Sequence, residues 1–262
     1  MIIRKSAYEI ERMAKSGELV ARTLALVGAA IEPGVTTTEL DAIAEKFIRS
    51  QGAEPTFKGY HGYPASICAS PNSMVVHGIP GDYTLAAGDI LSVDIGATLD
   101  GFVGDGAFTF PVGEIDSEAR RLLETCRAAL AAGVAEARAG NRLTDISHAV
   151  QVATEGPGFS VVRTLVGHGV GRVMHEDPQI PNYGEPGRGP ELTVGMTLAI
   201  EPMINAGSPD VYVHDDEWSI SSTDGSLSAH FEHTVAITAD GPRILTTAPG
   251  VDLAVIAGLS AN

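Results

Sequence analysis

Residues 92–106 read SVDIGATLDGFVGDG, and Asp94 and Asp105 each lie inside a short apolar run of this stretch. A carboxylate buried among apolar residues costs several kcal/mol unless it is paired or binds a metal. The stretch therefore predicts two acids that face a cation.

The centre of the stretch predicts a tight β-hairpin. Asp100-Gly101, flanked by alternating apolar residues, is typical of a two-residue turn. If Leu99 pairs with Phe102, position 96 lies opposite position 105, and the two acids become diagonal neighbours about 7–8 Å apart on one face. We also expect three glycines to leave space around the acids: Gly96, Gly104 and Gly106.

Three more candidate ligands occur later in the chain. Glu201 follows an apolar run, Glu232 precedes one, and His168 lies among small residues at 165–171. Each alone could be a surface acid, an ion-pair partner or a loop histidine. Together, four carboxylates and one imidazole suit two divalent cations such as Mn²⁺, Fe²⁺, Co²⁺ or Zn²⁺. The acidic run at 214–217 is interpreted instead as a solvated loop.

Composition narrows the class of protein. The chain has 262 residues, 44% of them hydrophobic, and a formal net charge of −16, which makes nucleic acid a poor partner. No apolar run reaches the roughly 18 residues of a membrane span, so we expect a soluble, cytoplasmic monomer. Cys68 and Cys126 are too few for a disulfide framework and are expected to be reduced.

The order of elements suggests a duplication. Helical periodicity and capping signals predict helices over residues 6–29, 36–51, 117–139 and 144–155, and strands follow each helical pair. The segment 34–40 resembles 140–146. We interpret residues 6–111 and 117–247 as an internal repeat within one catalytic domain, 1–262; a chance likeness between two capped helices is the alternative.

The motifs resemble those of type I methionine aminopeptidases. The similar segments are 59–64, 76–80, 93–96, 104–105, 167–171, 175–178, 200–203 and 231–234. The resemblance extends to about residue 247 and implies an α/β (α+β) pita-bread fold, in which pseudo-twofold halves surround a central antiparallel sheet. Because the sequence has no Cys/His-rich N-terminal extension, the short bacterial form fits best.

The resemblance also implies a reaction. Asp94 would bind one metal, His168 and Glu201 the other, and Asp105 and Glu232 both. A hydroxide between the ions would attack the first peptide carbonyl of a nascent chain that begins with methionine, with Glu201 as a proton shuttle. Two further catalytic histidines are implied, His77 near the scissile nitrogen and His175 near the carbonyl oxygen.

Further positions follow from the same resemblance. The implied substrate-binding residues are Phe57, Tyr60, Tyr63, Cys68, His77, Met174, His175 and Trp218. Asn72, Met74 and Ser228 match a site for Na⁺ or K⁺. The chain departs from well-known members at four positions, with Phe57 for Cys, Met174 for Phe, Gly96 for Thr and Val103 for His. A transient ribosome contact is a further implied partner.

Two other functions stay open. An aminopeptidase or dipeptidase for Xaa-Pro bonds would share these ligands, but it usually carries an additional N-terminal domain, for which 262 residues leave no space. A binding module that has lost catalysis would usually lack several ligands, whereas all five are present here.

Overall fold

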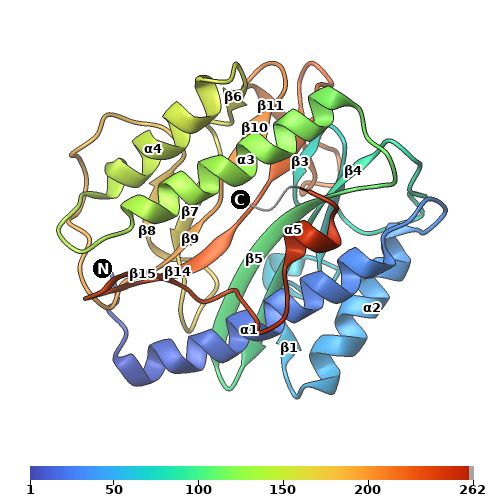
Figure 1. Cartoon of the computed structure of the whole chain (residues 1–262). Helices are drawn as coiled ribbons and strands as arrows, with labels where there is room; N and C mark the ends of the chain where they lie inside the picture. Colours follow the sequence, from blue (N-terminus) through green and yellow to red (C-terminus); the bar gives the residue numbers. More distant parts are fainter. Residues whose placement is uncertain (260–262) are drawn as a thin grey trace.

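The computed structural model describes residues 1–259. Two helix pairs lie on either side of a set of strands (Figure 1). The helices are α1 (Ala7–Ala30), α2 (Thr37–Ser50), α3 (Ser117–Glu136), α4 (Leu143–Glu155) and α5 (Leu253–Ile256), with one 3₁₀ turn, η1, at Tyr60–Gly62. The strands of the first half are β1 (Glu54–Pro55), β2 (Cys68–Pro71), β3 (Met74–Val76), β4 (Ile90–Leu99) and β5 (Phe102–Pro111). Those that follow are β6 (Ser160–Val161), β7 (Val166–Gly169), β8 (Glu176–Pro181), β9 (Thr197–Ile200), β10 (Met203–Asn205), β11 (Val211–Val213), β12 (Ile220–Ser222), β13 (Ser228–His230), β14 (His233–Thr238) and β15 (Gly241–Ile244).

Capping interactions explain where the first two helices begin. The Ser6 hydroxyl accepts from the Glu9 backbone N–H, and the Glu9 carboxylate accepts from the Ser6 N–H; Thr36 and Glu39 form the same box at α2. The four predicted helices are present within one to three residues. The largest difference is at α3, which ends at Glu136 because Ala137 leaves the helical conformation.

The strands pair antiparallel throughout. β4 is central to one sheet, in the order β1-β4-β2 with β5 on β4, and β15-β14-β9-β7-β8 form a five-stranded sheet. Two three-stranded ladders, β13-β10-β6 and β11-β12-β3, complete the strand set. The α/β class with antiparallel sheets is therefore confirmed.

The β4–β5 hairpin has the predicted register. Leu99 pairs with Phe102, and Gly96 pairs with Asp105. The turn residues Asp100 and Gly101 have φ angles of 51° and 78°, as a two-residue turn that continues the strand twist requires.

The prediction that three glycines clear space around the acids was wrong for two of them. A Cβ at Gly104 would lie 2.6 Å from the Gly17 nitrogen of α1, and one at Gly106 would lie 3.3 Å from Val20 of the same helix. Side chains alternate along a strand, so both positions lie on the opposite face of β5 from Asp105. These glycines allow α1 to approach the hairpin closely; only Gly96 lies on the face of the acids.

One main core runs through both halves of the chain. It includes Leu24 of α1, Val93 of β4, Leu123 of α3 and Leu198 of β9, all at most 2% exposed. The order of two helices followed by strands occurs twice, as predicted from the sequence. The shared core is consistent with one domain, and we retain the repeat of 6–111 and 117–247 as a proposal.

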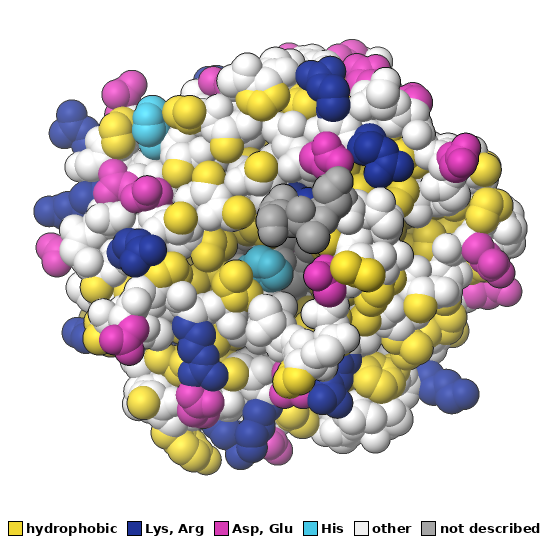
Figure 2. Space-filling model, viewed as in Figure 1, with side chains coloured by type: hydrophobic (Ala, Val, Ile, Leu, Met, Phe, Trp, Pro, Cys, Tyr) yellow, Lys and Arg dark blue, Asp and Glu magenta, His cyan; other side chains and the backbone are white. Residues whose placement is uncertain are grey.

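The surface carries charges of both signs. On the face in Figure 2, Lys and Arg side chains are interspersed with Asp and Glu. Within residues 1–259, no helix is long and apolar enough to cross a membrane. Cys68 and Cys126 are buried free thiols, as the sequence predicts.

Candidate metal centre and active site

All the predicted ligands and substrate-contacting side chains surround one cavity of about 170 Å³. Its lining includes Phe57, Tyr60, Tyr63, Cys68, His77, Asp94, Asp105, His168, Met174, His175, Glu201, Trp218 and Glu232. The structure thus brings together residues that are spread over most of the chain. Their individual roles stay predictions.

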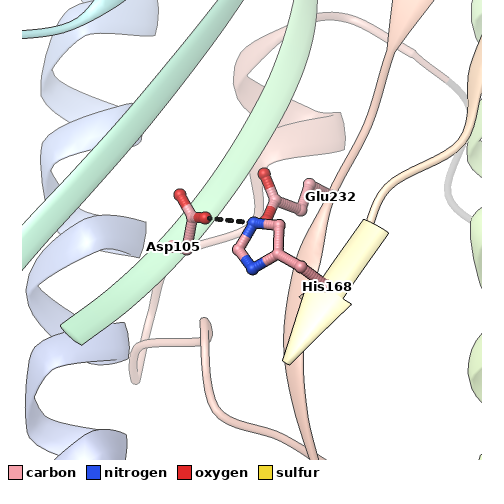
Figure 3. Close-up of side chains that lie close together, drawn as sticks. All are labelled: Asp105, His168 and Glu232. Carbon is pink, nitrogen blue, oxygen red and sulfur yellow. Dashed lines mark ion pairs between the residues drawn. The ribbon is translucent and has the colours of Figure 1, made fainter. Parts of the chain in front are cut away.

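Three ligands converge most closely (Figure 3). Asp105 extends from β5, His168 from β7 and Glu232 from the segment between β13 and β14, and one ligand atom of each lies within 4.8 Å of the others. His168 Nε2 lies 3.5 Å from Asp105 Oδ2 and 3.5 Å from Glu201 Oε1. Since its Nδ1 lies 2.8 Å from the Gly169 carbonyl, Nδ1 carries the proton and Nε2 is left to face the acids.

Asp94 and Glu201 complete the acidic lining from the two central strands. Asp94 stands on β4, two residues from Gly96 and therefore on the same face. Glu201 follows β9 directly, and β9 lies between β7 and β14 in the five-stranded sheet. Each half of the chain thus contributes two acids, as predicted.

Two threonines connect the segments that carry Asp105 and Glu232. The Thr234 hydroxyl donates to the Asp105 carbonyl (2.8 Å) and accepts from the Asp105 N–H (3.2 Å). Thr109 makes the same pair of bonds to His230, at 2.8 and 2.9 Å. Midway between them, the Glu232 N–H donates to the Ala107 carbonyl (2.9 Å). These bonds fix how the two ligand-bearing segments lie along one another.

The buried ligand atoms fit a metal. Within the described chain, Asp94 Oδ1, Asp105 Oδ1 and Glu232 Oε1 are buried and have no hydrogen-bond partner. Such atoms are rare in folded proteins, because the cost of removing them from water is not recovered. Four carboxylates and an imidazole around one cavity are the donor set that divalent cations prefer.

Burial and crowding shift the pKa values of these acids and of His168. Burial, together with the neighbouring carboxylates, raises the pKa of Asp94 and of Glu232 well above the usual range, and burial raises the pKa of Glu201 to about 8. Burial would lower the pKa of His168, but Asp105 and Glu201 raise it to about 9. Bound cations would offset both the burial of these carboxylates and the repulsion between them.

The two predicted catalytic histidines lie at the edge of this acidic cluster. Burial lowers the pKa of His77, and burial together with His168 lowers the pKa of His175 to about 4, so both rings are neutral at pH 7. Tyr60 Oη lies 2.7 Å from His175 Nδ1, and the His168 and His175 rings are 4.3 Å apart. When Tyr60 donates this bond, His175 presents a protonated Nε2 as a hydrogen-bond donor.

An aromatic wall forms another part of the cavity lining. Phe57 meets Tyr63 edge to face with ring centres 6.5 Å apart, and Tyr63 meets Trp218 at 5.1 Å. Tyr63 Oη donates to backbone carbonyls at 2.9 and 3.0 Å, which anchors the wall. Cys68 and Met174 also line the cavity, so the sulfur and aromatic surfaces are adjacent.

The sequence reasoning missed His230. This buried side chain lines the cavity, and its Nε2 lies 3.7 Å from Glu201 Oε2 without a hydrogen-bond partner among the described residues. Burial lowers its pKa to about 3. The signal was present: His230 precedes Glu232 by two residues, and alternate residues of an extended segment share a face. Val76, Leu165, Val166 and Met203 are other lining residues that were missed.

Two predictions concern residues outside the cavity lining. The loop at 214–217 is a local turn, in which the Asp216 carboxylate accepts from the N–H groups of Trp218 and Ser219. In the predicted monovalent-cation site, the Ser228 N–H donates to the Asn72 carbonyl at 2.9 Å. Met74 begins β3 nearby in sequence. Nothing in these contacts tests cation binding.

Residues 11–239 match the family model described as metallopeptidase family M24. The chain belongs to metallopeptidase family M24. Members of this family bind divalent metal ions, which agrees with the donor set of the cavity. The fold is the pita-bread fold that the sequence resemblance implied.

Three individual proteins show how similar this chain is to members with known names. The chain is 53% identical over 246 residues to a methionine aminopeptidase of Clostridium perfringens, covering 94% of this chain and 99% of the relative. A crystal structure of methionine aminopeptidase from Thermotoga maritima matches with a TM-score of 0.93 and 46% identity, over 94% of this chain and all of the other. A prolidase from Pyrococcus furiosus matches with a TM-score of 0.74 and 25% identity, over 94% of this chain but 65% of the prolidase.

Proposed function

We propose that this chain is a metal-dependent aminopeptidase that removes the N-terminal methionine of peptides and nascent proteins by hydrolysis. The observation that carries the proposal is that an acidic, metal-fitting cluster and a group of aromatic and sulfur side chains line the same cavity. Relatives that share about half of the sequence along nearly their whole length are methionine aminopeptidases.

The five predicted ligands would hold two divalent ions. Asp94 would bind one divalent ion, His168 and Glu201 the other, and Asp105 and Glu232 would contact both. When bound, such ions lower the pKa of a water from about 15.7 toward 7 and polarise the carbonyl that is attacked. Mn²⁺, Fe²⁺, Co²⁺ and Zn²⁺ all suit this mixture of carboxylate and imidazole ligands.

Three side chains would handle protons and developing charge. Glu201 would take a proton from the attacking water and deliver it to the leaving amine as the peptide C–N bond breaks. His175 would donate from Nε2 to the carbonyl oxygen as negative charge develops there, with Tyr60 holding the ring in that tautomer. His77 would lie near the scissile nitrogen.

The substrate methionine would occupy the apolar side of the cavity. A flexible thioether packs well against aromatic rings and other sulfur atoms, which Phe57, Tyr63, Trp218, Cys68 and Met174 provide. The cavity therefore favours an enzyme that recognises a methionine side chain beside the metal-binding residues.

Several accompanying proposals come from the sequence resemblance. They are a cytoplasmic, monomeric enzyme, a transient ribosome contact, and Na⁺ or K⁺ bound by backbone carbonyls near Asn72, Met74 and Ser228. Two of these residues are in contact, because the Ser228 N–H donates to the Asn72 carbonyl.

A substrate panel tests the proposed function. Anaerobic protein reconstituted with each metal should release free methionine from Met-Ala-Ser, detected by mass spectrometry, much faster than it cleaves Ala-Pro peptides. Faster cleavage of Ala-Pro would favour an Xaa-Pro peptidase, although the identity to a prolidase is 25% and that to a methionine aminopeptidase is 53%. No turnover with any metal, despite metal binding, would favour a non-catalytic module.

A further inference from the structure

Position 96 on β4 has no space for a side chain, so only glycine fits there without a shift of its neighbours. A Cβ at this position would lie 2.6 Å from Cε1 of Phe57 and 3.0 Å from Cβ of Thr56. Real Cβ atoms essentially never approach neighbours within 3.0 Å. Gly96 is not among the glycines with positive φ, so its backbone does not itself require glycine.

The position of Gly96 connects this contact to the active site. Gly96 shares a face of β4 with Asp94 and pairs across the hairpin with Asp105. The Phe57 ring therefore packs on a residue that neighbours two predicted metal ligands. On the neighbouring strand β2, Cys68 pairs with Asp94 and forms the next part of the pocket.

The neighbours of Phe57 limit where its ring can move. The backbone before it is held on β4, because Pro55 pairs with Ala97 and the Thr56 N–H donates to the Gly96 carbonyl at 2.9 Å. Phe57 is 7% exposed, and Tyr63 packs against its edge. Because Phe57 also lines the cavity, displacement of its ring by a side chain at position 96 would change the shape of the proposed methionine pocket.

We propose that Phe57 and Gly96 act as one specificity element, in which the missing side chain at position 96 seats the aromatic ring that shapes the methionine pocket. This inference rests on the proposed function. It also explains two of the departures from the well-known pattern together. Position 96 has lost a side chain, as Gly in place of Thr, and position 57 has gained a larger one, as Phe in place of Cys.

A double-mutant cycle tests the coupling. In the wild-type background, Gly96→Ala should raise KM for Met-Ala-Ser about tenfold or more, with a smaller change in kcat, because the displaced ring competes with the substrate side chain. In a Phe57→Ala background, the same Gly96→Ala change should cost less than about twofold. Equal costs in both backgrounds, or no cost in either, would overturn the proposal.

Gly106→Ala is the matched control. It adds the same methyl group to the same hairpin, but its Cβ would face Val20 and Thr246 at 3.3 Å, away from Phe57. Its effect on KM should therefore be additive with Phe57→Ala. Coupling as strong as that of Gly96 would show that the hairpin as a whole, rather than the ring contact, responds to the substitution.

A second readout does not depend on turnover. Trp218 is the only tryptophan in the chain, and it packs on Tyr63, which packs on Phe57. Gly96→Ala should shift the emission of folded, metal-free protein, and Phe57→Ala should abolish that shift; an unchanged spectrum in Gly96→Ala would contradict the inference. If the wild type releases no methionine, the proposed function fails, whereas a wild-type enzyme with no coupling at position 96 refutes only this inference.

Discussion

The β4–β5 hairpin and the C-terminal strands each supply acids to the same centre, but by different physical means. Asp94 and Asp105 are joined by one two-residue turn, so their relation is set by the register of a single hairpin. His168, Glu201 and Glu232 come from separate segments, and Glu232 is placed by bonds that cross from β14 and β13 to β5. Local geometry fixes the first pair, and long-range contacts fix the rest.

The test with the largest expected effect compares one ligand from each region. Asp105→Ala and Glu232→Ala should each lower kcat/KM for Met-Ala-Ser by at least about a thousandfold, or ~4 kcal/mol, because each would contact both ions. Initial rates with saturating metal measure the loss. Asp215→Asn, in the exposed loop, serves as the control and should retain activity within about twofold. A hairpin variant that remained active while Glu232→Ala did not would show that the two regions contribute unequally.

The next test removes a group that touches substrate but no metal. His175→Ala should lower kcat by roughly two to three decades, since loss of one donor to a developing oxyanion costs about 2.7–4 kcal/mol. Both metals should still bind, as measured by calorimetry. Full activity, or loss of a metal, would refute the assigned role.

A smaller effect is expected from the cross-segment bonds. Thr234→Val removes the hydroxyl that holds the Asp105 backbone and should weaken metal binding about 10–100-fold, the range typical of groups that orient ligands. Thr234→Ser keeps the hydroxyl and should bind metal nearly as the wild type does. Thr23→Val removes a buried hydroxyl from α1 that donates to the Leu19 carbonyl within the same helix, and it should leave metal affinity unchanged. If Thr23→Val and Thr234→Val weaken binding equally, the effect is general instability.

The smallest expected effect concerns pH. In metal-free protein, the pKa of Glu201 is about 8 when folded against 4.5 as its ordinary value, and that of His168 is about 9 against 6.5. The folded state then binds more protons than the unfolded state between pH 6.5 and 8, so the free energy of unfolding should fall by about 1–3 kcal/mol as pH rises through this window. The lowered pKa values of His77, His175, His230 and His233 act in the opposite direction, but mainly below pH 6.5, so they reduce the slope only at the lower end of this window.

Urea unfolding in EDTA at pH 6.5, 7.25 and 8 measures this slope. Excess Mn²⁺ should remove it, because the ion holds the carboxylates deprotonated at every pH. Stability that rises with pH in EDTA would contradict the crowding of acids described above.

The same contrast explains what the sequence could and could not predict. The hairpin register followed from Asp100-Gly101 and alternating residues, and the first two helices followed from capping boxes whose partners are three residues apart. The threonine bonds could not be predicted, because they join residues more than 120 positions apart. Gly104 and Gly106 were misassigned although alternation along β5 places both on the face opposite Asp105; only the packing of α1 against that face could not be predicted. His230 was missed although its spacing from Glu232 was visible.

The central claim is that both regions together hold two divalent ions. Anaerobic calorimetric titration of metal-free protein with Mn²⁺ tests it directly, with Asp94→Ala and Glu201→Ala titrated in parallel. We expect two ions per wild-type chain and about one for each variant, since each of these acids would bind a different ion. One ion or none in the wild type, or two ions in either variant, would contradict it.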